Sequence, residues 1–202
     1  MSDTKFDICN KALVLVGANT ITSFTQNTTE SKVSNQLYES TLENLLTRCR
    51  WRFASKQAQL SKNTTNPDAR YESSYALPSD AQIIHTVTVG DSVIKFDRYG
   101  QNLFTDTTSS DIVIADYTFQ PNEDIFPPYF KQTLVFELAS LFAGAIARND
   151  QLSDLYYKRA IAQLAIAKAT DAQAQTTRRL NVDRFRNVRN RTALSNITAT
   201  SP

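Results

Sequence analysis

The chain has 202 residues, of which 41% are hydrophobic, and a formal net charge of +2. This apolar content can bury a core, which excludes a disordered chain. The first residues lack the basic and apolar runs of a secretory leader, and no apolar run is long enough to cross a bilayer, so we expect synthesis in the cytoplasm and no membrane partner.

Positive charge is concentrated near the C-terminus. Six arginines and one aspartate give residues 178–191 a charge of +5 and leave −3 on the rest of the chain. We call residues 178–202 the C-terminal arm.

Two helices are predicted at the start of the chain. The first has Asp3 or Thr4 as its N-cap and Gly17 at its end, and its apolar face consists of Phe6, Cys9, Leu13 and Val16. The second begins at a capping box formed by Asn27 and Glu30 and runs to about Arg48. Both cysteines, Cys9 and Cys49, fall in helical patterns and are interpreted as small buried hydrophobic residues, without a disulfide.

The middle of the chain changes to the pattern of short strands. Arg50 to Phe53 alternates charged and aromatic residues, which predicts a strand with Trp51 and Phe53 facing inward. Residues 61–74 are polar and predict a surface loop. Four runs rich in β-branched and aromatic residues then predict an antiparallel meander of about four strands: 83–89, 93–96, 102–105 and 112–119. Exposed turns separate them at Gly90-Asp91 and Tyr99-Gly100.

Two long antiparallel helices are predicted to follow. Pro127 and Pro128 suit a helix start, and the apolar stripe after them comprises Leu134, Leu138, Leu141 and Ala145. A break at Asn149-Asp150 precedes a second helix to about residue 175. The predicted fold is α+β: an antiparallel bundle of about four helices with an inserted small antiparallel β domain and an extended arm. The expected boundaries are 1–56 and 122–177 for the helical halves, 57–121 for the β domain and 178–202 for the arm.

The sequence offers no catalytic constellation. His85 is the only histidine, and with Cys9 and Cys49 it does not give the ligand spacing of a zinc site, so a strand-surface or core histidine is expected. The four glycines are isolated, which excludes a phosphate-binding loop. Glu137 lacks a partner acid or base in the sequence and is interpreted as lying on a solvated or inter-subunit face. We therefore expect no enzymatic activity, catalytic residue, metal or cofactor.

The arm has three interpretations: a solvated tail, a nucleic-acid binder and a segment that docks on an acidic protein. Apolar residues interleave with its arginines, namely Leu180, Val182, Phe185 and Val188. Phosphates make no use of such anchors, so the pattern favours a protein groove.

An ordered series of short motifs resembles the head-to-tail adaptor family of short-tailed, T7-like bacteriophages, often called tail tubular protein A. The series covers roughly residues 5–175, and its motifs lie at 8–13, with Gly17, 50–54, 75–80, 100–106, 112–117, 127–130 and 138–143. The resemblance implies a structural virion protein of the tail or neck. It also implies a dodecameric ring that joins the portal protein to the tail nozzle, of tail tubular protein B type, and lines a channel for DNA without sequence specificity.

Under this resemblance, the arm would dock on the portal through Arg178, Arg179, Leu180, Arg184, Phe185, Arg186, Val188, Arg189 and Arg191. The turns of the β domain, Gly90, Asp91, Tyr99 and Gly100, would face the nozzle or a neighbouring subunit. The alternative is a cellular nucleic-acid-binding protein that acts through the arginines of the arm; its affinity would fall steeply with salt.

Overall fold

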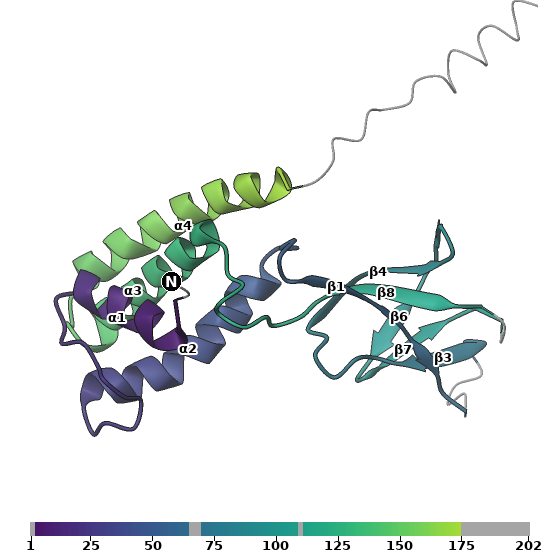
Figure 1. The fold of residues 1–202 in the computed structure, drawn as a ribbon, viewed down its shortest axis with the longest axis horizontal. Coiled ribbons are helices and arrows are strands. Elements are labelled where there is room, and N and C mark those ends of the chain that lie inside the picture. The colour runs from purple at the N-terminus through teal and green to yellow at the C-terminus, as the bar shows by residue number, and fades with distance from the viewer. Residues whose placement is uncertain (1–2, 65–69, 109–110, 175–202) are drawn as a thin grey trace, which may run out of the picture. The chain divides into compact units, whose positions relative to one another are not determined.

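The computed structural model describes residues 3–64, 70–108 and 111–174, and within them the chain forms four helices and eight strands (Figure 1). The helices are α1 (Lys5–Leu15), α2 (Thr29–Thr47), α3 (Pro128–Ala145) and α4 (Asp150–Ala172). All eight strands lie between α2 and α3 in the chain. The prediction of a mixed helical and antiparallel fold is confirmed.

The strands form two four-stranded antiparallel sheets. One has the order β1-β8-β4-β5 and the other β2-β3-β7-β6. The bounds are Ser55–Gln59 (β1), Ser61–Lys62 (β2), Ser73–Ala76 (β3), Ile83–Val89 (β4), Ser92–Val93 (β5), Asp97–Tyr99 (β6), Asn102–Thr105 (β7) and Val113–Thr118 (β8). The expected meander of about four strands was therefore wrong in number and order, since β1 and β3 pair with strands far along the chain.

Local capping explains where the first two helices begin. The Thr4 hydroxyl accepts a hydrogen bond from the Asp7 amide at 3.3 Å, and the Asp7 carboxylate accepts one from the Thr4 amide at 2.9 Å. This is a complete capping box. At α2 the cap is Thr28, whose hydroxyl accepts from the Ser31 amide, and not Asn27 as predicted.

The helical core is organised around α3, which contacts α1, α2 and α4. Leu134, Leu138 and Phe142 are fully buried there. Leu141, predicted to lie in the same stripe, is 44% exposed. Phe130 lies on the same side of α3 about three turns earlier and is covered by the Trp51 ring, at 5.1 Å between centroids. At Leu141 the stripe is no longer covered.

The connection from α2 to β1 also differs from the prediction. Residues 51–54 form a bend and a turn, and the strand starts only at Ser55. Trp51 is fully buried, and its indole N–H donates to the Leu45 carbonyl at 2.8 Å, which anchors the ring at the end of α2. Phe53 is half-buried. The segment 61–74, predicted as a loop, contains β2 and the start of β3.

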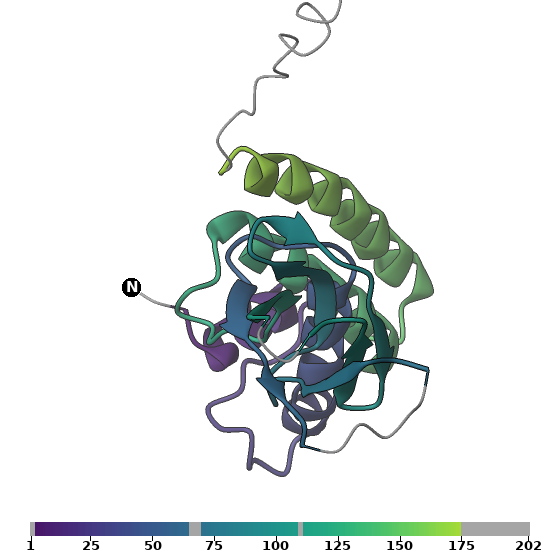
Figure 2. The same cartoon turned by 90° about the vertical axis from the view of Figure 1, so that its right-hand side faces the viewer.

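A second, smaller core lies among the strands, where Leu60, Tyr75, Val87, Leu103 and Val113 are buried together. No helix in the described part of the chain combines the length and the hydropathy needed to span a membrane. In both views α4 lies at the outer edge of the helices, so one long side of it faces away from them (Figure 1, Figure 2).

Candidate functional site

The two predicted turns are exposed hairpin connections. Gly90 and Asp91 join β4 to β5, and Gly100 follows Tyr99 between β6 and β7. The φ angles of Gly90 and Gly100 are +56° and +60°, which glycine adopts without strain. The Tyr99 ring packs against Phe104 with 5.6 Å between centroids. That these turns face a nozzle or a neighbouring subunit stays a prediction. The C-terminal arm, with all its predicted docking residues, lies outside the described residues.

One buried carboxylate joins three separate segments. Asp171, 4% exposed in the last turn of α4, accepts hydrogen bonds from the Arg52 amide and the Tyr129 hydroxyl, each at 2.8 Å. Burial and this hydrogen bond to Asp171 raise the pKa of Tyr129, so the phenol stays protonated as the donor. The carboxylate thus ties the end of α4 to the turn before β1 and to the first turn of α3.

Basic side chains surround this junction. Arg50, Arg52 and Lys168 line a hollow of about 280 Å³ that also touches Trp51 and Asp171. Arg50 forms an ion pair with Asp116 of β8 at 3.4 Å. The hollow lies at the end of α4, just before the segment that leads to the arm.

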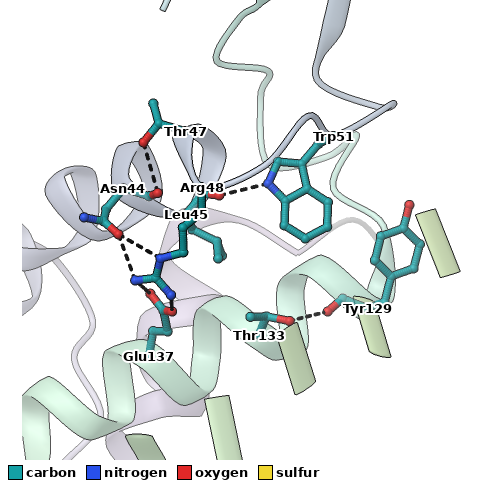
Figure 3. Close-up of polar contacts among 8 residues, drawn as sticks. All are labelled: Asn44, Leu45, Thr47, Arg48, Trp51, Tyr129, Thr133 and Glu137. Atoms are coloured by element: carbon teal, nitrogen blue, oxygen red, sulfur yellow. Dashed lines mark hydrogen bonds and ion pairs between the residues drawn. The ribbon is translucent and has the colours of Figure 1, made fainter. Parts of the chain in front are cut away.

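A second polar cluster corrects the interpretation of Glu137. Its side chain is not solvated: it is 8% exposed and forms a bidentate ion pair with Arg48 at the end of α2 (Figure 3). The Arg48 guanidinium also donates to the Asn44 amide oxygen at 2.8 and 3.1 Å. Burial raises the pKa of Glu137, and the attraction of Arg48 opposes that rise. The cluster ties α2 to α3.

A groove of about 400 Å³ lies over this ion pair. Residues from three helices line it: Leu37, Ser40, Thr41, Asn44 and Arg48 of α2, Glu137, Ser140 and Leu141 of α3, and Tyr157 of α4. Leu141 is 44% and Tyr157 55% exposed, and Ile161, one turn further along α4, is 48% exposed. We call the groove together with Ile161 the α2–α4 groove. Tyr157 and Ile161 are four residues apart on α4 and therefore share one side of that helix.

Sequence reasoning missed this groove, although a signal was present. A helix that packs against the core on one side needs apolar residues on that side only, but α4 carries them on other sides as well. Leu155, Tyr157, Ile161 and Ile166 are the additional apolar residues, and all four are exposed.

No protein-family model matches this chain, and a search of curated proteins found no match. Its surfaces therefore carry the functional inference.

The remaining candidate residues take part in local packing. His85 lies at an irregularity in the pairing of β4 with β8, and its Nε2 is 2.7 Å from the Thr118 hydroxyl. Cys9 is buried in the helical core, and burial raises its pKa to about 12; Cys49 is half-buried, and neither forms a disulfide. Within the described ranges, no three His, Cys, Asp or Glu side chains gather as metal ligands would.

A groove of about 610 Å³ also lies between α1 and α3. Its charged rim is paired internally, with Lys11 at 2.6 Å from Asp3 and Asp7 held in the capping box. Its exposed apolar residue is Val14, at 62%.

Proposed function

We propose that this chain is a structural protein of a virion: a head-to-tail adaptor that forms a ring between the portal and the tail nozzle of a short-tailed phage. The ordered motifs over residues 5–175 support this function. One structural observation carries the self-association: Leu141 and Tyr157, two exposed apolar side chains from different helices, line the same groove. Exposed apolar side chains that adjoin, rimmed by polar residues, are typical of protein interfaces.

The proposed arrangement follows the order of elements along the chain. The helices form one antiparallel bundle, and the strands form an insertion between α2 and α3. The arm, which begins beyond α4, docks on the portal, while the turns at Gly90-Asp91 and Tyr99-Gly100 face the nozzle or a neighbour. Twelve copies enclose the channel through which DNA passes. The role is structural and needs no catalytic residue or cofactor.

A second candidate, nucleic-acid binding, is favoured by one specific observation. Arg50, Arg52 and Lys168 line a common hollow near the start of the segment that leads to the arm. With the six arginines of residues 178–191 they would supply a run of positive charge for phosphates. Affinity for DNA would then follow the number of cations and fall steeply with salt.

Truncation of the arm tests these two functions against each other. Deletion of residues 178–202 is expected to abolish co-sedimentation with portal rings, whereas deletion of 192–202 alone, which keeps every predicted docking residue, is expected to preserve it. Phe185→Ala is expected to weaken portal binding, because an apolar anchor is lost. Normal portal binding by the 178–202 deletion would refute the docking role. The second function would be favoured if Phe185→Ala had no effect on portal binding while replacement of the arginines abolished DNA binding, and if that DNA binding weakened steeply with salt.

A further inference from the structure

We infer that the α2–α4 groove and the basic hollow at the end of α4, lined by Arg50, Arg52 and Lys168, form one site for an acidic amphipathic helix of a partner protein. A helix bound in such a groove lays its apolar side into it, and its charged residues meet charges of opposite sign at the rim. The inference goes beyond the proposed function, which uses only the apolar part of this site.

The groove and the hollow lie end to end along the same helices. Arg48 at the end of α2 lines the groove, and the residues that follow it, 49–52, line the hollow. Glu137 of α3 lines the groove, and Tyr129 lies about two turns earlier on the same helix (Figure 3). The Tyr129 hydroxyl donates to Asp171, which lines the hollow. Both helices thus lead from one part of the site to the other.

The third helix, α4, borders both parts with one of its sides. Tyr157 lines the groove and Lys168 lines the hollow. Lys168 follows Tyr157 by eleven residues, which make three turns and about 20° more, so the two side chains leave the helix in nearly the same direction. The two residues are about 16 Å apart along the helix axis. A bound helix of about three turns therefore covers the site.

The two ends of the site differ in their chemistry. At the groove end, Leu141 and Tyr157 are 44% and 55% exposed. The hollow end carries three cations, of which one is paired with Asp116 of β8, and one carboxylate, that of Asp171, whose two oxygens already accept hydrogen bonds. Lys168 is exposed and takes part in no ion pair within the described residues. The site therefore favours a helix with apolar side chains at one end and carboxylates at the other.

A second copy of this chain fits the hollow end less well. Among the described helices, α4 has the most exposed apolar side chains, and its exposed charged residues are Asp150, Asp154, Lys158, Arg159 and Lys168. Cations are in excess there and would meet the cations of the hollow. If copies associate through Leu141 and Tyr157, the partner helix covers the same side chains, so its binding opposes self-association. This consequence alone rests on the proposed function.

A fluorescent synthetic peptide and the full chain test the inference. The peptide has about fifteen residues, with glutamates in its first turn, which the helix dipole also favours, and leucines at three- and four-residue steps after them. Because α2 and α4 run in the same direction (Figure 1) and end at the hollow, the peptide lies antiparallel to both. Fluorescence anisotropy measures its affinity, and a peptide with lysines in place of the glutamates is the control.

Substitutions at each end of the site should weaken binding of the acidic peptide. Leu141→Asp should weaken it by at least about tenfold, because a charge replaces an apolar contact. Lys168→Glu should weaken it by roughly five- to tenfold and should strengthen binding of the lysine peptide. Lys158→Glu, the same change of charge about 80° around α4, is the matched control and should leave the affinity unchanged. All three sites are exposed, so each variant should fold, as circular dichroism will check, and each keeps the C-terminal arm.

Three results would overturn the inference: no binding of the acidic peptide by the parent chain, unchanged binding by Leu141→Asp, or equal losses in Lys158→Glu and Lys168→Glu. Native mass spectrometry tests the proposed self-association separately. A chain that binds the peptide but is monomeric without it would refute self-association and leave the helix site standing. Oligomers that persist when the peptide is saturating would refute the predicted competition.

Discussion

Replacement of Asp171 by alanine should destabilise the protein more than its position in the last turn of a helix suggests. Asp171 is 4% exposed and accepts two hydrogen bonds of 2.8 Å, from the Arg52 amide and the Tyr129 hydroxyl. Hydrogen bonds to a charged group contribute about 1.5–3 kcal/mol each, so the two amount to roughly 3–6 kcal/mol.

Two gains offset part of that loss. A carboxylate at a helix C-terminus opposes the helix dipole by about 0.3–1 kcal/mol, and alanine has the higher helix propensity by up to about 0.7 kcal/mol. The expected net change in the free energy of unfolding for Asp171→Ala is therefore a loss of about 2–4 kcal/mol. Asp171→Asn should lose only about 1 kcal/mol, because its amide oxygen can accept from the Arg52 amide while its N–H₂ donates to the Tyr129 oxygen.

Urea unfolding followed by circular dichroism measures both variants. With slopes of about 2–3 kcal/mol per molar, typical of chains of this size, Asp171→Ala should lower the midpoint by roughly 1 M. Tyr129→Phe provides a double-mutant cycle, since in the Asp171→Ala background it should remove little further stability. Equal effects of Asp171→Ala and Asp171→Asn, or additive effects in the cycle, would refute the claim that the carboxylate joins the three segments.

Three further predictions concern the core, the Arg48–Glu137 ion pair and the glycines. Leu138→Ala should lower the free energy of unfolding by about 2–5 kcal/mol, whereas Leu141→Ala, at a 44% exposed site, should lower it by less than about 1 kcal/mol; equal thermal shifts would mean that the wrong side of α3 was placed inside. The pKa of Glu137 in the folded protein lies above its usual value of 4.5, so protonation of this carboxyl favours the folded state. This contribution to the free energy of unfolding is full at low pH and is lost as the pH rises through the folded-state pKa. Glu137→Gln should therefore remove that decline from urea midpoints measured between about pH 4 and pH 8. Gly100→Ala should destabilise the protein by about 1–2 kcal/mol because the φ angle there is +60°. Gly144→Ala, in α3 and with no atom near the added methyl, should stabilise it by about 0.5–1 kcal/mol. Shifts of the melting temperature in the same direction for both variants would contradict this.

Strong periodicity explains which elements the sequence could predict. The predicted run 83–89 coincides with β4 and 102–105 with β7, because apolar and β-branched residues there are bounded by turn residues. β1 was missed because Ser55–Gln59 is polar and has no alternation of apolar residues. This segment becomes a strand by pairing with β8, which lies more than fifty residues further along the chain. Pairing between distant segments leaves no local signal.

The candidate site was predictable only in part, for a similar reason. The exposed turns could be located because glycine marks them. Glu137 could not be predicted as a buried acid in an ion pair, since its partner Arg48 lies 89 residues earlier and only the packing of α2 on α3 joins them. The α2–α4 groove needs three helices, and no single stretch of sequence encodes it.

The strands begin and end at one place on the helical part. Ser55 at the start of β1 pairs with Thr118 at the end of β8, and the next residues along continue the contact, with the Phe119 amide 3.0 Å from the Ala54 carbonyl oxygen. Paired residues in antiparallel strands lie about 5 Å apart. Residues 55–118 can therefore be exchanged or lengthened as one block without moving the ends of α2 and α3. If the block is deleted, a short link can join residues 54 and 119. Changes in the strands during evolution then leave the packing of the helices on one another intact.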